Sequence, residues 1–404
     1  MNVPRNLAGK DFTQNKYAYF DWIRENEPVY KAKMFVMDIV CLSRYQDCAD
    51  MLRDDRFVRN RSVATGGGGR LPFPVPKTVA LLADSMITTD NPEHRRLRLL
   101  VNKAFTPRSL KSMESQLELM THQLLDEAEK NSSAGVIDLM SAYSLPIPVQ
   151  VISQLMGVSD EDMPEFRKGV RVLTEGMSGF GIMRTLLWDM PGLVKFCRGM
   201  IERKRQHPGD DVLSQLIEAE EEGDKLSEDE LVAMMFLLVF AGYETTVHLI
   251  NNAVLTLLQH PDQLQKLKTD PSLCNTAVEE VLRFKGPVHG TKPNWAREDV
   301  EWGGVKIKRG TPVMPLLGAA NRDPRQFNNP ESFDITRDPN KHLAFGYGIH
   351  LCLGAWLARL ETRVALNTLL ARYPDLELAV DTTELRLQTV PFWHRYESLP
   401  IRLN

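Results

Sequence analysis

The stretch Phe345-Gly346-Tyr347-Gly348-Ile349-His350-Leu351-Cys352-Leu353-Gly354 is followed at once by the helical pattern of residues 355–373. It places a single cysteine among glycines, directly before a helix. Glycines permit tight turns and let the backbone approach a flat ligand closely. The N-terminus of a helix favours a thiolate, because its free N–H groups carry partial positive charge. The stretch therefore predicts a loop in which Cys352 is available as an anionic sulfur ligand.

A lone cysteine in such a loop can have one of four roles. Haem iron is one of the few partners that takes a single thiolate as its axial ligand. A buried cysteine that acts as a small hydrophobe is the commonest alternative, but the flanking glycines build no packed core. A zinc site would need more ligands than His350 supplies. A cysteine nucleophile with His350 as its base is also possible, although residues two apart are a poor guide to pairing in space.

Residues 90–98 predict a helix with a histidine and an arginine on one face. Pro92 suits the first turn of a helix, and His94 and Arg98 lie four residues apart. Such a pair can hold a carboxylate through charge-assisted hydrogen bonds. Taken alone, however, the pattern favours an exposed basic helix without a ligand.

A long apolar helix is predicted from Ser227 to about residue 260. Ser227 and Glu230 have the spacing of a capping box, and Pro261 ends the helix. A helix that is apolar nearly all round is expected in the interior. Its centre, Ala241-Gly242-Tyr243-Glu244-Thr245-Thr246, breaks the pattern with a glycine, a carboxylate and two hydroxyls. This break predicts either a site where something must fit or a kink that serves packing.

A fourth motif lies on a helix predicted over residues 278–284. Glu280 and Arg283 are three residues apart, so their side chains can pair on one helix face. Most such pairs are surface salt bridges, and the spacing alone is weak evidence for anything more.

Together, the four motifs resemble the cytochromes P450 in their order and approximate spacing. Residues 345–354 resemble the haem-ligand signature of that family, and Glu280 with Arg283 resembles its ExxR motif, which supports the haem side and is not catalytic. The resemblance covers almost the whole chain. It implies a mainly α fold with a long central helix and small β-sheets, in one domain spanning residues 1–404.

The resemblance also implies a role for each candidate site residue. Cys352 would ligate the iron of haem b (iron protoporphyrin IX), and Glu244 and Thr245 would form the catalytic acid–alcohol pair of the oxygen-binding groove. His94, Arg98 and His350 would anchor the haem propionates. The full set expected to contact the cofactor is His94, Arg98, Ala241, Gly242, Thr245, Phe345, Gly346, His350, Cys352 and Gly354.

The implied activity is monooxygenation, in which one oxygen atom of O2 enters a hydrophobic small molecule by hydroxylation or epoxidation. The sequence shows no flavin or iron–sulfur domain, so electrons are expected from a separate ferredoxin or flavodoxin and its NAD(P)H reductase. Two alternatives are a peroxygenase of the same fold and a haem protein that only carries or senses. The Glu244–Thr245 pair argues against the peroxygenase, since peroxide-using relatives tend to have lost it.

In one place the sequence departs from the family pattern. Many soluble bacterial members have an arginine two residues before the alanine that is Ala296 here, and that arginine usually binds a propionate. This chain has Asn294. Lys292 and Arg297 are candidates to compensate.

Composition sets further limits. The 404 residues are 43% hydrophobic and 25% charged, as in an ordinary globular protein, and a net charge of −4 gives no reason to expect a nucleic-acid partner. Five widely spaced cysteines are no disulfide framework and suit a reducing compartment. Residues 1–11 contain no apolar anchor, and the longest apolar run is too short for a bilayer. We therefore expect a cytoplasmic monomer without a membrane anchor.

The remaining predictions concern local structure and surfaces. Residues 29–42 predict a β-hairpin, and residues 300–317 predict a small sheet. The substrate pocket is expected to be apolar and to draw on residues 81–88, 172–180, 238–245, 287–290 and 390–392. His289 would either orient a substrate there or be a solvated histidine. A basic surface for an acidic redox partner is expected to comprise Arg95, Arg96, Lys103, Arg108 and Lys111.

Overall fold

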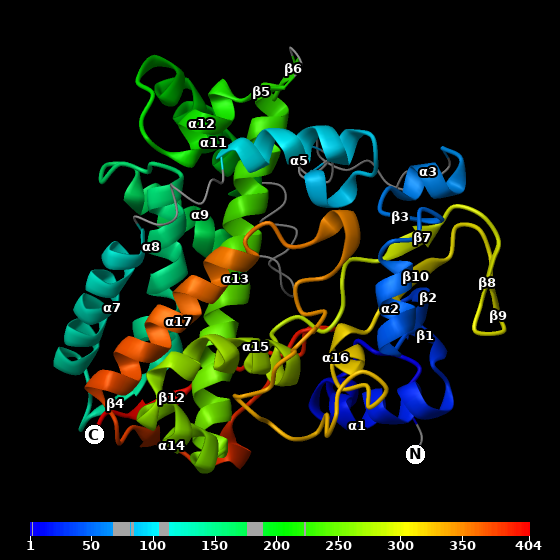
Figure 1. Cartoon of the computed structure of the whole chain (residues 1–404). Helices are drawn as coiled ribbons and strands as arrows, with labels where there is room; N and C mark the ends of the chain where they lie inside the picture. Colours follow the sequence, from blue (N-terminus) through cyan, green and yellow to red (C-terminus); the bar gives the residue numbers. More distant parts are fainter. Residues whose placement is uncertain (2, 68–80, 82–84, 105–112, 176–188, 222–223) are drawn as a thin grey trace. The chain divides into compact units, whose positions relative to one another are not determined.

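The computed structural model describes residues 1, 3–67, 81, 85–104, 113–175, 189–221 and 224–404 (Figure 1). The chain divides into two compact units. The first unit comprises Met1–Gly69, Glu118–Ser144 and Thr245–Asn404, and the second comprises Arg70–Leu117 and Leu145–Glu244. The predicted single domain is not tested by this division and stays a prediction.

Helices make up most of the described chain. Those that lie within the first unit are α1 (Lys10–Asn26), α2 (Tyr45–Met51), α3 (Arg61–Thr65), α14 (Pro261–Thr269), α15 (Cys274–Lys285), α16 (Leu317–Ala320) and α17 (Ala355–Arg372). Those within the second are α5 (Glu93–Ala104), α8 (Pro146–Leu155), α9 (Met163–Glu175), α11 (Met190–Gln206) and α12 (Val212–Glu218). Helices α7 (Met113–Lys130) and α13 (Glu228–Gln259) contribute residues to both units.

The first unit contains a five-stranded sheet in the order β1-β2-β10-β7-β3. Its strands are β1 (Val29–Met34), β2 (Met37–Leu42), β10 (Pro312–Pro315), β7 (Asn294–Ala296) and β3 (Phe57–Val58). Strands β1 and β2 form the predicted hairpin, and β10 joins β2 in parallel. At the far edge β7 pairs antiparallel with both β10 and β3.

Smaller sheets complete the β structure. In the first unit β4 (Val136–Asp138), β11 (Glu377–Leu378) and β12 (Pro400–Arg402) form a three-stranded sheet. There β8 (Val300–Trp302) and β9 (Val305–Ile307) form a hairpin, so the prediction of strands over residues 300–317 is confirmed. In the second unit β5 (Glu220–Glu221) pairs with β6 (Asp224–Lys225).

The five-stranded sheet is buried on both faces, and successive residues of β2 show this alternation. Ile39 and Cys41 belong to a core cluster with Phe12 and Phe20 of α1, whereas Val40 and Leu42 belong to a second cluster with Met51 of α2. Because neighbouring side chains of a strand point to opposite faces, α1 and α2 cover different sides of the sheet.

Helix α13 has the length and start that the sequence predicts. The Glu230 carboxylate accepts a hydrogen bond from the backbone N–H of Ser227, and the Ser227 hydroxyl accepts one from that of Glu230, so the capping box is confirmed. The helix continues without a break to Gln259. By length and hydropathy it could cross a membrane, but 56% of its most apolar window is buried inside the structure, as expected of a core helix.

Candidate functional site

The loop that carries Cys352 is built from tight turns. Gly346 and Gly348 have φ angles of 74° and 72°, a left-handed conformation that glycine adopts without strain. The backbone N–H of Cys352 donates to the carbonyl of Phe345 at 3.0 Å, which closes the loop on itself. Helix α17 starts at Ala355, three residues after the cysteine. The predicted arrangement of a glycine loop that leads into a helix is confirmed.

Cys352 differs from the other four cysteines in its exposure. Its side chain is exposed, whereas the others are buried. Burial raises the pKa of the Cys41, Cys197 and Cys274 thiols to about 12, which keeps them protonated and unreactive. Of the five cysteines, only the one in the glycine loop therefore has an exposed side chain. The prediction that it is not a small core hydrophobe is confirmed.

A chain of contacts fixes this loop to its neighbouring helices. Arg359 of α17 stacks over the Phe345 ring, with its guanidinium carbon 4.4 Å from the ring centroid. The same guanidinium donates to Glu279 of α15 at 2.5 and 2.8 Å. His342 Nε2 lies 3.1 Å from the same carboxylate. Helices α15 and α17 pack side by side (Figure 1), so Glu279 connects both of them to the start of the cysteine loop.

Electrostatics favour the charged form of Glu279. Burial acts to raise the pKa of this carboxyl, but its hydrogen bonds to Arg359 and His342 outweigh burial and lower the pKa to about 2. Sequence reasoning missed Glu279, His342 and Arg359. Their spacing in the chain gives no signal, because the three residues come from α15, a loop and α17.

The Glu280–Arg283 pair has the structural role that the sequence predicts. Both side chains are fully buried and form a bidentate ion pair at 2.7 and 2.8 Å. Arg283 also donates to the carbonyls of Asn321, Pro330 and Ser332. Glu280 accepts further hydrogen bonds, from the side chains of Arg337 and Asn340 and from the backbone N–H of Asp334. The pair therefore fixes α15 to the irregular segment that precedes the cysteine loop.

The centre of α13 combines burial with exposure. Val239, Tyr243 and Glu244 are buried, whereas Phe240 and Ala241 are exposed and Thr245 is half-buried. A Cβ atom added at Gly242 would lie 2.7 Å from Cδ1 of Ile152 in α8. Gly242 therefore has a packing role within the second unit. The helix is continuous at Gly242. The break in the apolar pattern therefore reduces the side-chain volume at this position but does not interrupt the helix.

Helix α5 carries the predicted histidine and arginine on one turn. His94 is buried, and its backbone N–H donates to the Asp90 carbonyl at 2.9 Å, which starts the helix. Arg98 is half-buried. The His94 side chain is therefore not exposed, and the binding of a carboxylate by His94 and Arg98 stays a prediction.

One residue of the predicted basic surface, Arg96, already forms ion pairs within the chain. Arg96 forms ion pairs with Glu93, Asp224 and Glu230 within the second unit. Its charge is neutralised there, so its assignment to a docking surface is wrong. Arg95 and Lys103 are exposed, and Arg108 and Lys111 lie outside the described residues.

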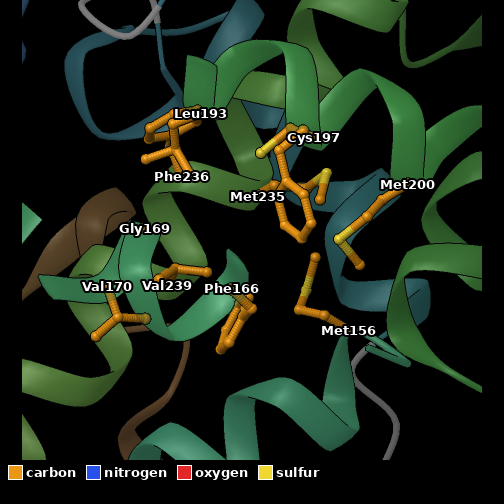
Figure 2. A pocket seen from close by; sticks show the side chains of 11 residues that line it. Met156, Phe166, Gly169, Val170, Leu193, Cys197, Met200, Met235, Phe236 and Val239 are labelled. Atoms are coloured by element: carbon orange, nitrogen blue, oxygen red, sulfur yellow. The ribbon is translucent and has the colours of Figure 1, made fainter. Parts of the chain in front are cut away.

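A pocket in the second unit is lined entirely by apolar atoms (Figure 2). It lies among α9, α11 and the part of α13 one to two turns before Gly242, and the side chains of Met156, Cys197 and Met200 bring sulfur atoms to it. Of the residues predicted to form the substrate pocket, it contains only Val239. Its lining is Met156, Phe166, Gly169, Val170, Leu193, Phe196, Cys197, Met200, Met235, Phe236 and Val239.

Neither prediction for His289 is correct. Its side chain is buried, with 2% of its surface exposed, and its Nε2 atom lies 3.2 Å from the Tyr17 hydroxyl. The ring also stacks with that of His394 at a centroid distance of 5.5 Å. Burial lowers the pKa of His289 well below its usual range, with Lys16 and other cations adding to the effect. It is a neutral core histidine, neither solvated nor a substrate contact.

Comparisons with known proteins agree with these features. A family model described as "Cytochrome P450" matches residues 5–210 and 192–388. The polyketide biosynthesis cytochrome P450 PksS of Bacillus subtilis (strain 168) is 39% identical over 400 residues, which cover 98% of each chain. The chain belongs to the cytochrome P450 family. The 6-deoxyerythronolide B hydroxylase of Saccharopolyspora erythraea, another P450 relative, is 36% identical over 415 residues and is covered in full, as is this chain.

Solved P450 structures share the fold. The structure of PksS from the bacillaene polyketide synthase of Bacillus subtilis 168 superposes with a TM-score of 0.91 at 38% identity and covers 99% of both chains. P450BioI, solved with an acyl carrier protein that bears hexadec-9Z-enoic acid, gives a TM-score of 0.87 at 36% identity and covers 98% of this chain and 99% of its own. The predicted P450 fold is thereby confirmed, and the chain is a P450 monooxygenase.

The residues present fit the haem that P450 enzymes bind through a cysteine thiolate. Cys352 is an exposed sulfur on a glycine-rich loop directly before α17, and a Cβ atom added at Gly354, two residues after it, would meet nothing within 4 Å. Among the described residues, no group of three or more His, Cys, Asp or Glu could hold a metal ion, so nothing there suggests the zinc alternative. Phe345, Gly346, His350, Cys352 and Gly354 lie together in the first unit, to which Thr245 also belongs. His94, Arg98, Ala241, Gly242 and Glu244 belong to the second unit.

Proposed function

We propose that this P450 hydroxylates or epoxidises a hydrophobic small molecule and that it uses haem b held by the Cys352 thiolate. The observation that carries the proposal is the exposed Cys352 on a glycine loop that Arg359 and Glu279 hold in place. A thiolate-ligated haem, when bound, supplies O2 activation and oxygen insertion. The protein positions the substrate, delivers protons and excludes water.

The proposal assigns the other candidate residues to holding the cofactor. His94, Arg98 and His350 would bind the propionate carboxylates, since charge-assisted hydrogen bonds to carboxylates are the strong ones. Ala241 and Gly242 present little side-chain volume, and Ala241 is exposed, as a residue next to a flat ring would be. Phe345, Gly346 and Gly354 would line the side of the thiolate.

Glu244 and Thr245 are proposed as the groups that move protons. The Thr245 Oγ1 atom would hold a proton near the reacting oxygen, and the Glu244 carboxyl would resupply it. Support comes from their positions: they are consecutive on α13, with Glu244 buried and Thr245 half-buried. A buried carboxyl next to a hydroxyl is suited to pass on a proton without exposing the site to bulk water.

The substrate is proposed to be a polyketide-like or other lipophilic molecule. The names of two relatives support the polyketide class: PksS is a polyketide biosynthesis P450, and another relative hydroxylates 6-deoxyerythronolide B. A fatty acyl chain on a carrier protein is a second candidate, because P450BioI was solved with such a partner.

Electrons are proposed to come from a ferredoxin or flavodoxin and its NAD(P)H reductase, and the enzyme is proposed to act as a cytoplasmic monomer. Support comes from bacterial relatives that match this chain over nearly its whole length. Redox partners recognise such enzymes mainly through complementary charge, so binding should weaken with salt.

The decisive experiment compares electron sources on the purified holoenzyme. Turnover with NAD(P)H plus a surrogate ferredoxin and its reductase is expected, using substrates first selected by haem spin-state shifts from a lipophilic library. Product formed only with hydrogen peroxide would show a peroxygenase instead. No product with either source would favour a carrier or sensor. The Cys352→Ala variant should lose the CO-difference spectrum of a thiolate ligand, with Cys274→Ala as the control.

A further inference from the structure

The turn between β1 and β2 has an unusual composition. Met34 pairs with Met37, so the turn consists of two residues, Phe35 and Val36. Only the first of them has a positive φ angle, 56° at Phe35, as in a type II′ hairpin turn. Glycine normally occupies that position, because a positive φ angle strains residues that have a side chain, and bulky ones most. Phe35 therefore makes this turn less stable than glycine would.

Both side chains of the turn are exposed. Phe35 has 63% of its surface exposed and Val36 has 94%, the largest fraction among the exposed large hydrophobic residues of the described chain. Single exposed apolar residues are common on protein surfaces, but two together at the tip of a hairpin form a small apolar projection. Neither the strain nor the exposure helps the chain to fold. A contact with something outside the chain would account for both.

The hairpin holds this tip in a fixed position. Six residue pairs align β1 with β2, and β2 continues the five-stranded sheet through β10. Near the tip, the backbone N–H of Lys33 donates to the carbonyl of Arg5, and the N–H of Leu7 donates to the carbonyl of Lys33. Because the outward-facing backbone groups of Lys33 are thus used, this end of β1 cannot add a strand from another chain. The tip is left to make contacts through its side chains.

Basic side chains lie behind the tip. Lys31 and Lys33 are exposed and, being two residues apart on β1, point to the same face of the hairpin. Arg5, whose backbone is bonded to that of Lys33, is exposed as well. Lys33 lies 3.9 Å from the Asp38 carboxylate, in an exposed pair of the kind that contributes little to stability. In the described part of the chain, Arg5 and Lys31 form no ion pair, so these residues together keep a net positive charge.

The size of the projection favours a lipid surface over a folded protein as its partner. A stable protein interface buries about 800 Å² on each partner. A phenylalanine side chain buries only roughly 150–250 Å², and the residues next to the turn are half-buried methionines and charged groups. In a bilayer, by contrast, insertion of a few apolar side chains is enough for reversible binding when basic residues attract anionic lipids. An apolar tip in front of a basic surface has both parts.

We propose that the Phe35–Val36 turn inserts into the interface of an anionic lipid bilayer and attaches the protein reversibly to its surface. Arg5, Lys31 and Lys33 then lie at the level of the lipid phosphates. Such a contact needs no membrane-spanning segment. A glycine in the turn would be more stable in water but would leave less to insert. The inference does not rest on the haem assignment, since none of these residues is among those proposed to bind haem.

The test measures co-sedimentation of the purified holoenzyme with unilamellar vesicles. One set of vesicles contains equal parts of phosphatidylcholine and phosphatidylglycerol, and the other contains phosphatidylcholine alone. The double variant Phe35→Gly, Val36→Asn has a favourable type II′ turn without the apolar side chains. Lys31→Gln removes one positive charge. Leu119→Gln is the matched control, because Leu119 is 62% exposed, as Phe35 nearly is, but lies on α7 and not on the hairpin.

We expect the wild-type protein to bind the anionic vesicles and to dissociate from them as salt is added. The double variant should bind roughly tenfold more weakly, because the inserted apolar area is lost, while its thermal midpoint stays equal or rises. Lys31→Gln should weaken binding roughly fivefold, the effect of one charge near an anionic surface. Leu119→Gln should match the wild type.

Three results would overturn the inference. The first is a wild-type protein that stays in solution with both kinds of vesicle. The second is a double variant that binds the anionic vesicles as tightly as the wild type, which would place the lipid contact elsewhere. The third is a wild-type dimer, seen by sedimentation velocity without lipid, that the double variant does not form, which would make the tip an interface between copies of the chain. None of these results would bear on the proposed function, whose test is the comparison of electron sources.

Discussion

Arg359 is shared between Phe345 and Glu279: its guanidinium stacks on the ring of the first and donates two hydrogen bonds to the carboxylate of the second. Phe345 begins the loop that ends with Cys352 and Gly354. A contact between a cation and an aromatic face contributes about 0.5–2 kcal/mol, more when it is desolvated. This arrangement makes the position of the cysteine loop depend on an ion pair between α15 and α17.

Replacing Arg359 with Met should loosen the cysteine loop without unfolding the protein. Methionine keeps most of the side-chain volume but removes both the cation and the hydrogen bonds. We expect a smaller fraction of haem in the thiolate form in the CO-difference spectrum, and faster conversion to an inactive form on storage. The matched control is Arg372→Met on the same helix, whose arginine pairs with Asp126. Equal spectra for the two variants would contradict this role.

Acid should weaken the same contact through Glu279. Its pKa in the folded protein is about 2, below the ordinary 4.5, so the folded state favours the ionised carboxyl. This contribution to stability is fully present above about pH 4.5 and is lost as the pH falls toward 2. Glu279→Gln should therefore be less stable than the wild type near pH 7, with the difference narrowing below pH 4.5. Urea unfolding from pH 7 to pH 3 measures it, and a difference independent of pH would refute the prediction.

The buried Glu280–Arg283 pair should tolerate loss of both charges better than loss of one. Glu280→Ala leaves the Arg283 charge buried without its carboxylate, at a cost of about 3–5 kcal/mol. We expect little soluble holoenzyme from it, and partial recovery when Arg283 is also changed to Met. Glu165→Ala removes an exposed pair of the same spacing and should cost no more than about 0.5 kcal/mol. The yield of haem-containing protein and the thermal midpoint are the measurements.

Replacing Gly242 tests whether its close contact with Ile152 of α8 is the reason that α13 has a glycine here. Gly242→Ala should lower stability by roughly 1–3 kcal/mol, because the new methyl group would press on Ile152. Adding Ile152→Val should recover part of the loss. Gly192→Ala in α11, where nothing lies within 4 Å of the added methyl group, should be neutral or stabilising by up to about 1 kcal/mol. If Ile152→Val brings no recovery of stability, the close contact with α8 is not what requires glycine.

Local sequence patterns were enough to predict the P450 fold and the cysteine loop. Glycine spacing, the capping box at Ser227 and the i,i+3 spacing of Glu280 and Arg283 are all read within one element. The contact between Arg359 and Glu279 could not be predicted in this way. It depends on the packing of two helices whose contacting residues are 80 positions apart, which no local pattern encodes.

The two wrong predictions have a common physical cause. Arg96 was expected on a docking surface and His289 in contact with solvent or substrate. Polar side chains are usually exposed, but a tertiary partner can reverse this preference. Three carboxylates neutralise Arg96, and Tyr17 accompanies the buried His289. Most of these partners are distant in sequence.

The many hydrogen bonds of Glu280 and Arg283 have a consequence for cooperativity. Segment 321–340 has almost no regular secondary structure, yet the pair bonds to its backbone or side chains at Asn321, Pro330, Ser332, Asp334, Arg337 and Asn340. The amide hydrogens of segment 321–340 should therefore exchange with solvent in one concerted opening, with a single free energy of opening. This irregular segment would then be protected from hydrogen exchange as well as a helix is. The cysteine loop that follows it would stay ordered for as long as the Glu280–Arg283 pair is intact.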